Sequence, residues 1–186
     1  KAYAAGAYEE ALRQYREAAQ AAPDDSRLHF NAGAAAYRAG KHDEAAQAFT
    51  KALESRDVSL QQRAYYDLGN ARFRLFEAAA KSAPEQGRTA LEQAVKAYEG
   101  ALALGPQDEN ARFNLDVAKA RLEDLKREQE QEKKQKEEQE KDQKQKAEQK
   151  QDQKQDQQAQ QPPPEQGQKQ DQKQDQQQDQ QGQQGQ

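Results

Sequence analysis

The chain has 186 residues, of which 33% are hydrophobic and 33% are charged, and it contains no Cys. Its formal net charge of −4 excludes the basic surplus that a nucleic-acid-binding protein needs. The lack of Cys excludes disulfides, thiol catalysis and Cys-ligated metal sites, and it fits the cytoplasm and the periplasm alike. No apolar run approaches the roughly 20 residues that a membrane-spanning helix requires.

Apart from two alanines, the apolar residues lie in the first two thirds of the chain. From Glu128 onward the only apolar side chains are Ala147 and Ala159, and 27 of these 59 residues are Gln. All packing therefore falls to residues 1–127, which are enough for one small domain. The net charge belongs to the remaining residues, because 1–127 hold 19 charges of each sign.

Small and aromatic residues recur with a period of 34 residues. The first copy consists of Gly6, Tyr8, Ala11, Tyr15, Ala18 and Pro23, and the second of Gly40, His42, Ala45, Phe49, Ala52 and Asp57. A third copy consists of Ala94, Tyr98, Ala101 and Pro106. Each copy is typical of a helical hairpin that cannot bury its apolar face alone, so we predict an all-α solenoid of stacked hairpins.

In chain order, the spacing of apolar residues predicts helices over 7–21, 26–39 and 42–54. The first helix ends before Pro23, which cannot continue it. The second ends at Gly40, which can adopt the left-handed conformation common at helix ends. These segments account for the first complete hairpin and the helix before it.

The next helix begins near Ser59 and carries Gly69, which matches Gly33 of the repeat before it. Ala94 follows Gly69 by 25 residues, whereas Ala45 follows Gly33 by 12, so the third copy starts 13 residues late. The intervening string FEAAAKSA favours helix, and the first strong breakers are Pro84 and Gly87. If these 13 residues are divided between two helices at 3.6 residues per turn, one hairpin should be longer by about two turns in each helix.

A capping helix is predicted over 109–125, and it should continue as a solvent-exposed charged extension over 128–150. Glu130 with Lys134 is one of several Glu–Lys pairs at i,i+4, each worth about 0.2–0.5 kcal/mol to an isolated helix. Residues 151–186 contain three consecutive prolines and are rich in Gln, Asp and Lys, so we expect a disordered tail.

The string G-x-Y-x-x-A-x-x-x-Y-x-x-A-x-x-x-x-P that begins at Gly6, with its copy from Gly40, resembles the tetratricopeptide repeat. The segments YYDLGNARFRL and YEGALALGPQDENARFNLDVAKARLEDL, followed by the Gln/Lys/Glu-rich tail, are similar to the repeat proteins of bacterial aerotolerance (Bat-type) operons. In those operons, tetratricopeptide repeats accompany von Willebrand type A proteins and a MoxR-type ATPase.

This resemblance implies a non-enzymatic protein-interaction scaffold in a bacterial envelope complex, with von Willebrand type A domain proteins as partners. In that family a signal peptide or a membrane-anchored domain precedes the repeats, so we expect an upstream segment and a periplasmic or membrane-associated location. A cytoplasmic location stays open. So does a structural spacer or self-assembly protein that acts through the Gln-rich tail.

In tetratricopeptide repeats the first helix of each hairpin lines a concave groove. By register, the resemblance implies that partner-binding residues here are Tyr3, Arg27, Phe30, Tyr37, Arg38, Arg63, Tyr66, Asn70, Phe73, Arg74, Phe113 and Arg121. Aromatic and Arg side chains are enriched in binding hot spots, and Arg pairs bidentately with carboxylates. The groove should suit an extended or helical peptide with apolar anchors and acidic flanks.

Some of these aromatic residues have an alternative role. Phe30, Tyr66 and Phe113 could fill the groove rather than contact a partner, whereas Phe49 and Tyr98 lie among alanines on second helices and should pack in the core.

No catalytic residue, cofactor or metal site is expected. The histidines, His29 and His42, lie on different predicted helices without Cys nearby, and no phosphate-binding glycine string occurs. An enzyme would need a nucleophile with a base, or a carboxylate pair isolated in a pocket, and the Asp and Glu residues are all expected on solvated faces.

Overall fold

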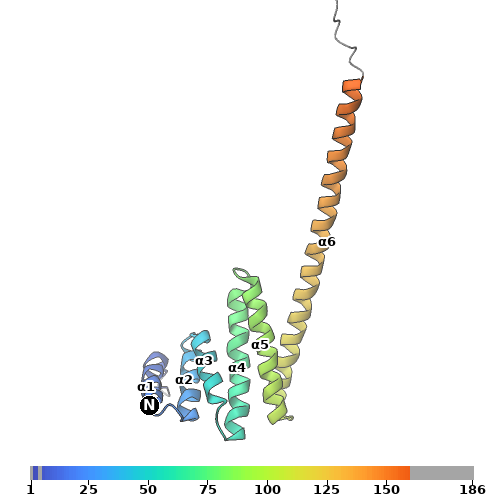
Figure 1. The fold of residues 1–186 in the computed structure, drawn as a ribbon. Coiled ribbons are helices and arrows are strands. Elements are labelled where there is room, and N and C mark those ends of the chain that lie inside the picture. Colours follow the sequence, from blue (N-terminus) through green and yellow to red (C-terminus); the bar gives the residue numbers. More distant parts are fainter. Residues whose placement is uncertain (1, 4–5, 160–186) are drawn as a thin grey trace, which may run out of the picture. The chain divides into compact units, whose positions relative to one another are not determined.

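The computed structural model describes residues 2–3 and 6–159, and the regular structure within them is helical (Figure 1). The helices are α1 (Tyr8–Ala21), α2 (Ser26–Arg38), α3 (His42–Ala52), α4 (Val58–Ala79), α5 (Pro84–Leu104) and α6 (Glu109–Ala159). The predicted all-α class is therefore confirmed. Of the disordered tail expected over 151–186, residues 151–159 are instead part of α6, and residues 160–186 lie outside the described residues.

The chain divides into two compact units, residues 1–132 and 133–186. In the first unit, α1 to α5 stand side by side in chain order, each packed against the next (Figure 1). In the second unit, residues 133–159 belong to α6, and the described side chains over 133–146 are exposed. The helix ends at Ala159, nine residues beyond the expected end at about 150.

Aspartate side chains cap the first helix of each hairpin. Asp25 accepts a hydrogen bond from the Arg27 backbone N–H at the start of α2, and Asp57 accepts one from the Ser59 N–H at the start of α4. Asp108 does the same for α6. A side-chain cap of this kind stabilises a helix by about 1 kcal/mol, so the boundaries predicted for these helices have a local cause.

Gly40 closes the turn between α2 and α3 at a φ of +76°. The Gly40 N–H donates to the Tyr37 carbonyl, and the Lys41 N–H donates to the Ala36 carbonyl, which is the Schellman pattern of helix ends. The left-handed conformation expected at Gly40 is therefore confirmed.

The hairpin of α4 and α5 is the long one. These helices have 22 and 21 residues, against 13 in α2 and 11 in α3. Their additional turns bury Phe76 and Leu91 in a second core cluster, which Leu115 of α6 completes. The first core cluster lies between α1, α2, α3 and α4 and includes Leu12 and Phe49.

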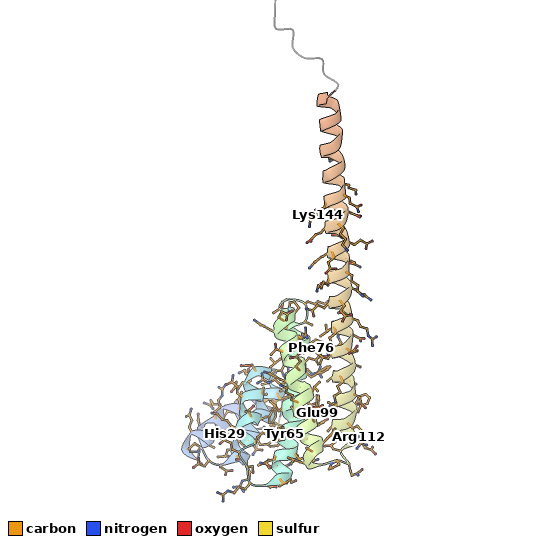
Figure 2. All side chains as sticks on the ribbon, turned by 45° about the vertical axis from the view of Figure 1, so that its right-hand side comes forward. His29, Tyr65, Phe76, Glu99, Arg112 and Lys144 are labelled. Carbon is orange, nitrogen blue, oxygen red and sulfur yellow. The ribbon has the colours of Figure 1, made fainter. Side chains whose placement is uncertain are left out.

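Within each hairpin the two helices meet at a glycine that receives an aromatic ring. A Cβ placed on Gly33 would lie 2.8 Å from the ring of Phe49, and one placed on Gly69 would lie 2.5 Å from the ring of Tyr98. The long hairpin has a reciprocal contact, in which the ring of Tyr65 on α4 packs against Gly100 of α5. Tyr65 is labelled in Figure 2. Phe49 and Tyr98 are buried, which confirms the core role predicted for them.

The first part of α6 covers the end of the array. Ala111, Leu115 and Ala118 bury one face of it, and Lys119 pairs with Glu99 of α5 at 2.8 Å. Three residues after Phe113, at the register that Gly33 and Gly69 hold in the earlier hairpins, α6 has the exposed Asp116. The helix is thus apolar on its inner face and polar on its outer face, as terminal elements of repeat arrays are.

The glycine contacts can be tested by overpacking one of them. We expect Gly69→Val to lower the free energy of unfolding by roughly 1–3 kcal/mol, because its side chain would have to displace the ring of Tyr98. Chemical denaturation followed by circular dichroism measures this. Ala120→Val, at an exposed position of α6, is the control and should change stability by less than about 1 kcal/mol. Equal effects of the two changes would contradict the packing role of Gly69.

Candidate partner-binding groove

A pocket of about 270 Å³ opens among the first helices of the hairpins and α5. It is lined by Tyr37 of α2, by Asn70, Phe73, Arg74 and Glu77 of α4, by Tyr98 of α5, and by Phe113, Asn114 and Val117 of α6. Five of the predicted partner-binding residues are brought together here. These five are Tyr37, Asn70, Phe73, Arg74 and Phe113.

One wall of the pocket is apolar and open to solvent. Phe113 is 68% exposed and Val117 is 41% exposed, and they lie one turn apart on the same face of α6. Across the pocket, Phe73 is held edge-to-face against Phe76 with 5.6 Å between ring centroids. Neighbouring exposed apolar side chains in a pocket are a feature of interaction sites rather than of ordinary surface.

The floor of the pocket is a hydrogen-bond network that joins three helices. The Asn70 Oδ1 accepts from the Tyr98 hydroxyl at 2.9 Å and from the Asn114 Nδ2 at 3.0 Å. Burial, with Tyr66 nearby, raises the pKa of Tyr98 above its ordinary value, so this hydroxyl stays protonated and donates. The sequence predicted Asn70 for the groove but assigned Tyr98 to packing alone, and the structure gives Tyr98 both roles.

Three of the predicted Arg residues already have carboxylate partners within the chain. Arg27 pairs with the capping Asp25 at 3.0 Å, and Arg121 lies 3.5 Å from Glu128. Arg74 pairs with Glu77 at 2.8 Å, and its Nε donates to the Tyr37 hydroxyl at 3.4 Å. Arg27 and Arg121 do not line the pocket.

The other two predicted Arg residues stack on aromatic rings. The Arg63 guanidinium lies 5.1 Å from the ring centroid of Phe30, and that of Arg38 lies 5.9 Å from the ring centroid of Tyr8. Neither forms an ion pair within the described residues. Both side chains are exposed, so their guanidinium groups keep donors for a partner.

The remaining predicted aromatic residues are occupied by internal packing. Phe30 packs against Phe49 at 5.6 Å, Tyr66 packs against Tyr98 at 6.2 Å, and both are half-buried. Tyr3 meets Tyr8 edge-to-face at 5.3 Å, beyond the residues that line the pocket. Of the three aromatic residues whose role the sequence left open, Phe113 is therefore the one whose ring is mostly free.

Asp67 is a residue that sequence reasoning missed; it does not line the pocket itself but lies beside the pocket residue Asn70. It lies on α4 between Arg63 and Asn70, four residues from one and three from the other, so the three share a face. The side chain is half-buried, and the expectation that every acidic residue is solvated is wrong for it. Burial raises the pKa of Asp67 to about 6, although a hydrogen bond from Asn70 and the charge of Arg63 act in the opposite direction.

A pattern in the sequence could have revealed it. Asp67 follows Tyr66 directly, just as Asn31 follows Phe30 and Asn114 follows Phe113. These three polar residues occupy the same register of α2, α4 and α6, and all are half-buried.

The fold and the groove together define a protein-interaction module built from helical hairpins. Comparison with protein families supports this, because residues 1–59 and 35–91 match the tetratricopeptide repeat. The chain therefore carries tetratricopeptide repeats over residues 1–91, and the resemblance inferred from the sequence is confirmed at that level. No curated protein matches the chain. In the described part of the chain, none of the helices has the length and apolarity needed to cross a membrane.

The network on the pocket floor predicts a stability effect. Asn70→Ala should lower the free energy of unfolding by about 2 kcal/mol, because it leaves the Tyr98 hydroxyl and the Asn114 amide without their shared acceptor. The control is Asn110→Ala on the exposed side of α6. Urea denaturation measures both variants, and a loss no larger than that of the control would show that the network contributes little.

The pKa of Asp67 predicts a pH dependence of stability. Because the folded-state pKa lies above that of the unfolded chain, the folded state binds the proton more tightly, and this stabilisation is lost as pH rises from about 4 to 6. At pH 7.5, Asp67→Asn should therefore stabilise the protein by roughly 1–2 kcal/mol, and at pH 4 the gain should vanish. The control is Asp116→Asn at an exposed site, compared by urea denaturation. A gain that is equal at both pH values would exclude Asp67 as the source.

Proposed function

We propose that the groove docks a segment of a partner protein through apolar anchors. The observation that carries this proposal is the exposure of Phe113, which places a mostly free aromatic ring beside a preformed pocket. Fully burying a side chain such as Phe or Val contributes about 1.5–3 kcal/mol, so Phe113 and Val117 together can supply a binding hot spot. Tetratricopeptide repeats are protein-interaction modules, which agrees with this use.

The pocket has the rigidity that such a site needs. Its floor is fixed by the hydrogen bonds of Asn70 to α5 and α6, and Phe73 is held by Phe76. A partner therefore orders few groove side chains on binding, which reduces the entropic cost of association. Arg38 and Arg63 are available for acidic residues that flank the apolar anchors.

For the wider context, we propose a scaffold in a bacterial envelope complex, at a periplasmic or membrane-associated location. The support is the similarity of two segments and the Gln-rich tail to the repeat proteins of Bat-type operons. Proteins with von Willebrand type A domains are then the partners to test first. The proposed role is non-enzymatic, because the groove presents apolar, amide and paired charged side chains.

The test uses residues whose loss leaves the core intact. Phe30 and Tyr66 are unsuitable because they pack against core aromatic rings, whereas Phe113 and Val117 are exposed. We expect the double variant Phe113→Ala/Val117→Ala to lose capture of a von Willebrand type A partner from a detergent-solubilised envelope extract, by at least about tenfold in quantitative mass spectrometry. This corresponds to losing about 1.4 kcal/mol of anchor burial.

The matched control is Val58→Ala, which truncates a side chain that is 55% exposed at the start of α4 and does not line the pocket. This variant should capture the same proteins as the unchanged chain. If the groove variant and the control behave alike, a different surface binds the partner.

A further inference from the structure

We propose that Asp67 makes the groove select a partner segment with a Lys or Arg side chain, which forms an ion pair with this carboxylate. This inference rests on the proposed docking function and names the partner chemistry that is recognised beside the pocket, next to Asn70. The apolar anchors provide affinity at Phe113 and Val117, and the carboxylate decides which segments are accepted.

The position of Asp67 follows from the repeat register. Asn31, Asp67 and Asn114 each directly follow the groove aromatic residue of their helix, so the three first helices present a row of half-buried polar side chains. The two outer members are neutral amides, and the middle member is the carboxylate. A partner that crosses α2, α4 and α6 therefore meets one negative charge in this row, at its centre.

Asp67 lacks a partner that matches its charge. Its nearest hydrogen-bond donor is the Asn70 Nδ2 at 3.5 Å, the outer limit for such a bond. Arg63, one turn earlier on α4, stacks on the ring of Phe30 and does not pair with Asp67. Within the described residues, the ion pairs leave Asp67 unmatched.

A half-buried carboxylate without a close cation destabilises the folded chain at neutral pH, because burial disfavours its charged form. An ammonium or guanidinium group brought by the partner would reverse this effect by donating charge-assisted hydrogen bonds. An acidic side chain at the same place would add repulsion. The position of Asp67 beside the pocket therefore favours a basic residue, although Arg38 and Arg63 favour acidic residues elsewhere on the partner.

Binding of a cation should also depend on pH. Through Asn70, Asp67 neighbours Tyr98 of α5 and the neutral Asn114 of α6. The titratable groups further along the pocket are Tyr37 of α2, with His42 of α3 packed against it, and Glu77, which pairs with Arg74. Arg63 is the charged group that acts on Asp67. His42 must be separated from Asp67 in any experiment, since burial lowers the pKa of His42 and its titration would also fall in the acidic range.

The experiment selects ligands without assuming a partner. A phage-displayed library of random 12-residue peptides is panned at pH 7.5 against the full chain, and binders are retained if Phe113→Ala/Val117→Ala weakens them. We expect these groove-dependent peptides to be enriched in Lys or Arg at a fixed distance from an aromatic or aliphatic residue. Panning against Asp67→Asn should yield groove-dependent peptides without that enrichment.

The dissociation constants of one selected peptide, labelled with a fluorophore, then measure the coupling between its basic residue and Asp67. Replacing its basic residue by Gln should weaken binding to the unchanged chain by about tenfold or more and leave binding to Asp67→Asn within about twofold. With a pKa of Asp67 near 6, about a tenth of the free protein molecules have an ionised Asp67 at pH 5. Because the ionised form binds the basic residue, the affinity should be about tenfold weaker at pH 5 than at pH 7.5. Asp67→Asn should remove this pH dependence, and His42→Gln should retain it.

The outcomes separate the two proposals. Groove-dependent peptides without a basic preference, or an affinity that Asp67→Asn leaves unchanged, would overturn the role of Asp67 while the docking function stands. A pH dependence that His42→Gln abolishes would assign the titration to the histidine and also overturn it. If the library yields no peptide that needs Phe113 and Val117, the docking function itself fails, and this inference fails with it.

Discussion

The close approach of two helices at a glycine is the contact on which the rest of the repeat unit depends. Gly33 receives the ring of Phe49, and Gly69 receives the ring of Tyr98, with no room for a Cβ at either position. This contact fixes the rotation of α4 about its axis, and so it also fixes which face of α4 remains for the groove. Phe73, Asn70 and Asp67 are therefore placed by the packing behind them, and the core and the groove share one register.

The polar residues of the groove differ in how far the protein satisfies them. The Asn70 Oδ1 accepts hydrogen bonds from Tyr98 of α5 and Asn114 of α6, so this side chain links α4 to both helices. Asp67 has one long contact and a raised pKa, so its carboxylate opposes folding at neutral pH. A neutral side chain at position 67 would make the folded protein more stable. The presence of a carboxylate that lowers stability there points to a role in recognition.

The fold could be predicted from the sequence because its determinants are local and periodic. The caps at Asp25 and Asp57 and the left-handed Gly40 act over a few residues, and the 34-residue period reports the hairpin itself. The groove was only partly predictable, because its residues acquire their roles through distant partners. Register alone could not show that Asn70 bonds to Asn114, 44 residues away, or that Arg27 is occupied by a cap. Exposure of Phe113 depends on how the helices pack, and the partial burial of Asp67 does so as well.

Asp116 gives the array of hairpins a defined end. At this register the earlier first helices have the glycine that admits the aromatic ring of the following helix, whereas α6 presents a carboxylate to solvent. A further hairpin, whether from the same chain or from a neighbouring molecule, would have to bury that charge against an aromatic ring. A carboxylate at this position therefore disfavours stacking of a further hairpin against this face of α6.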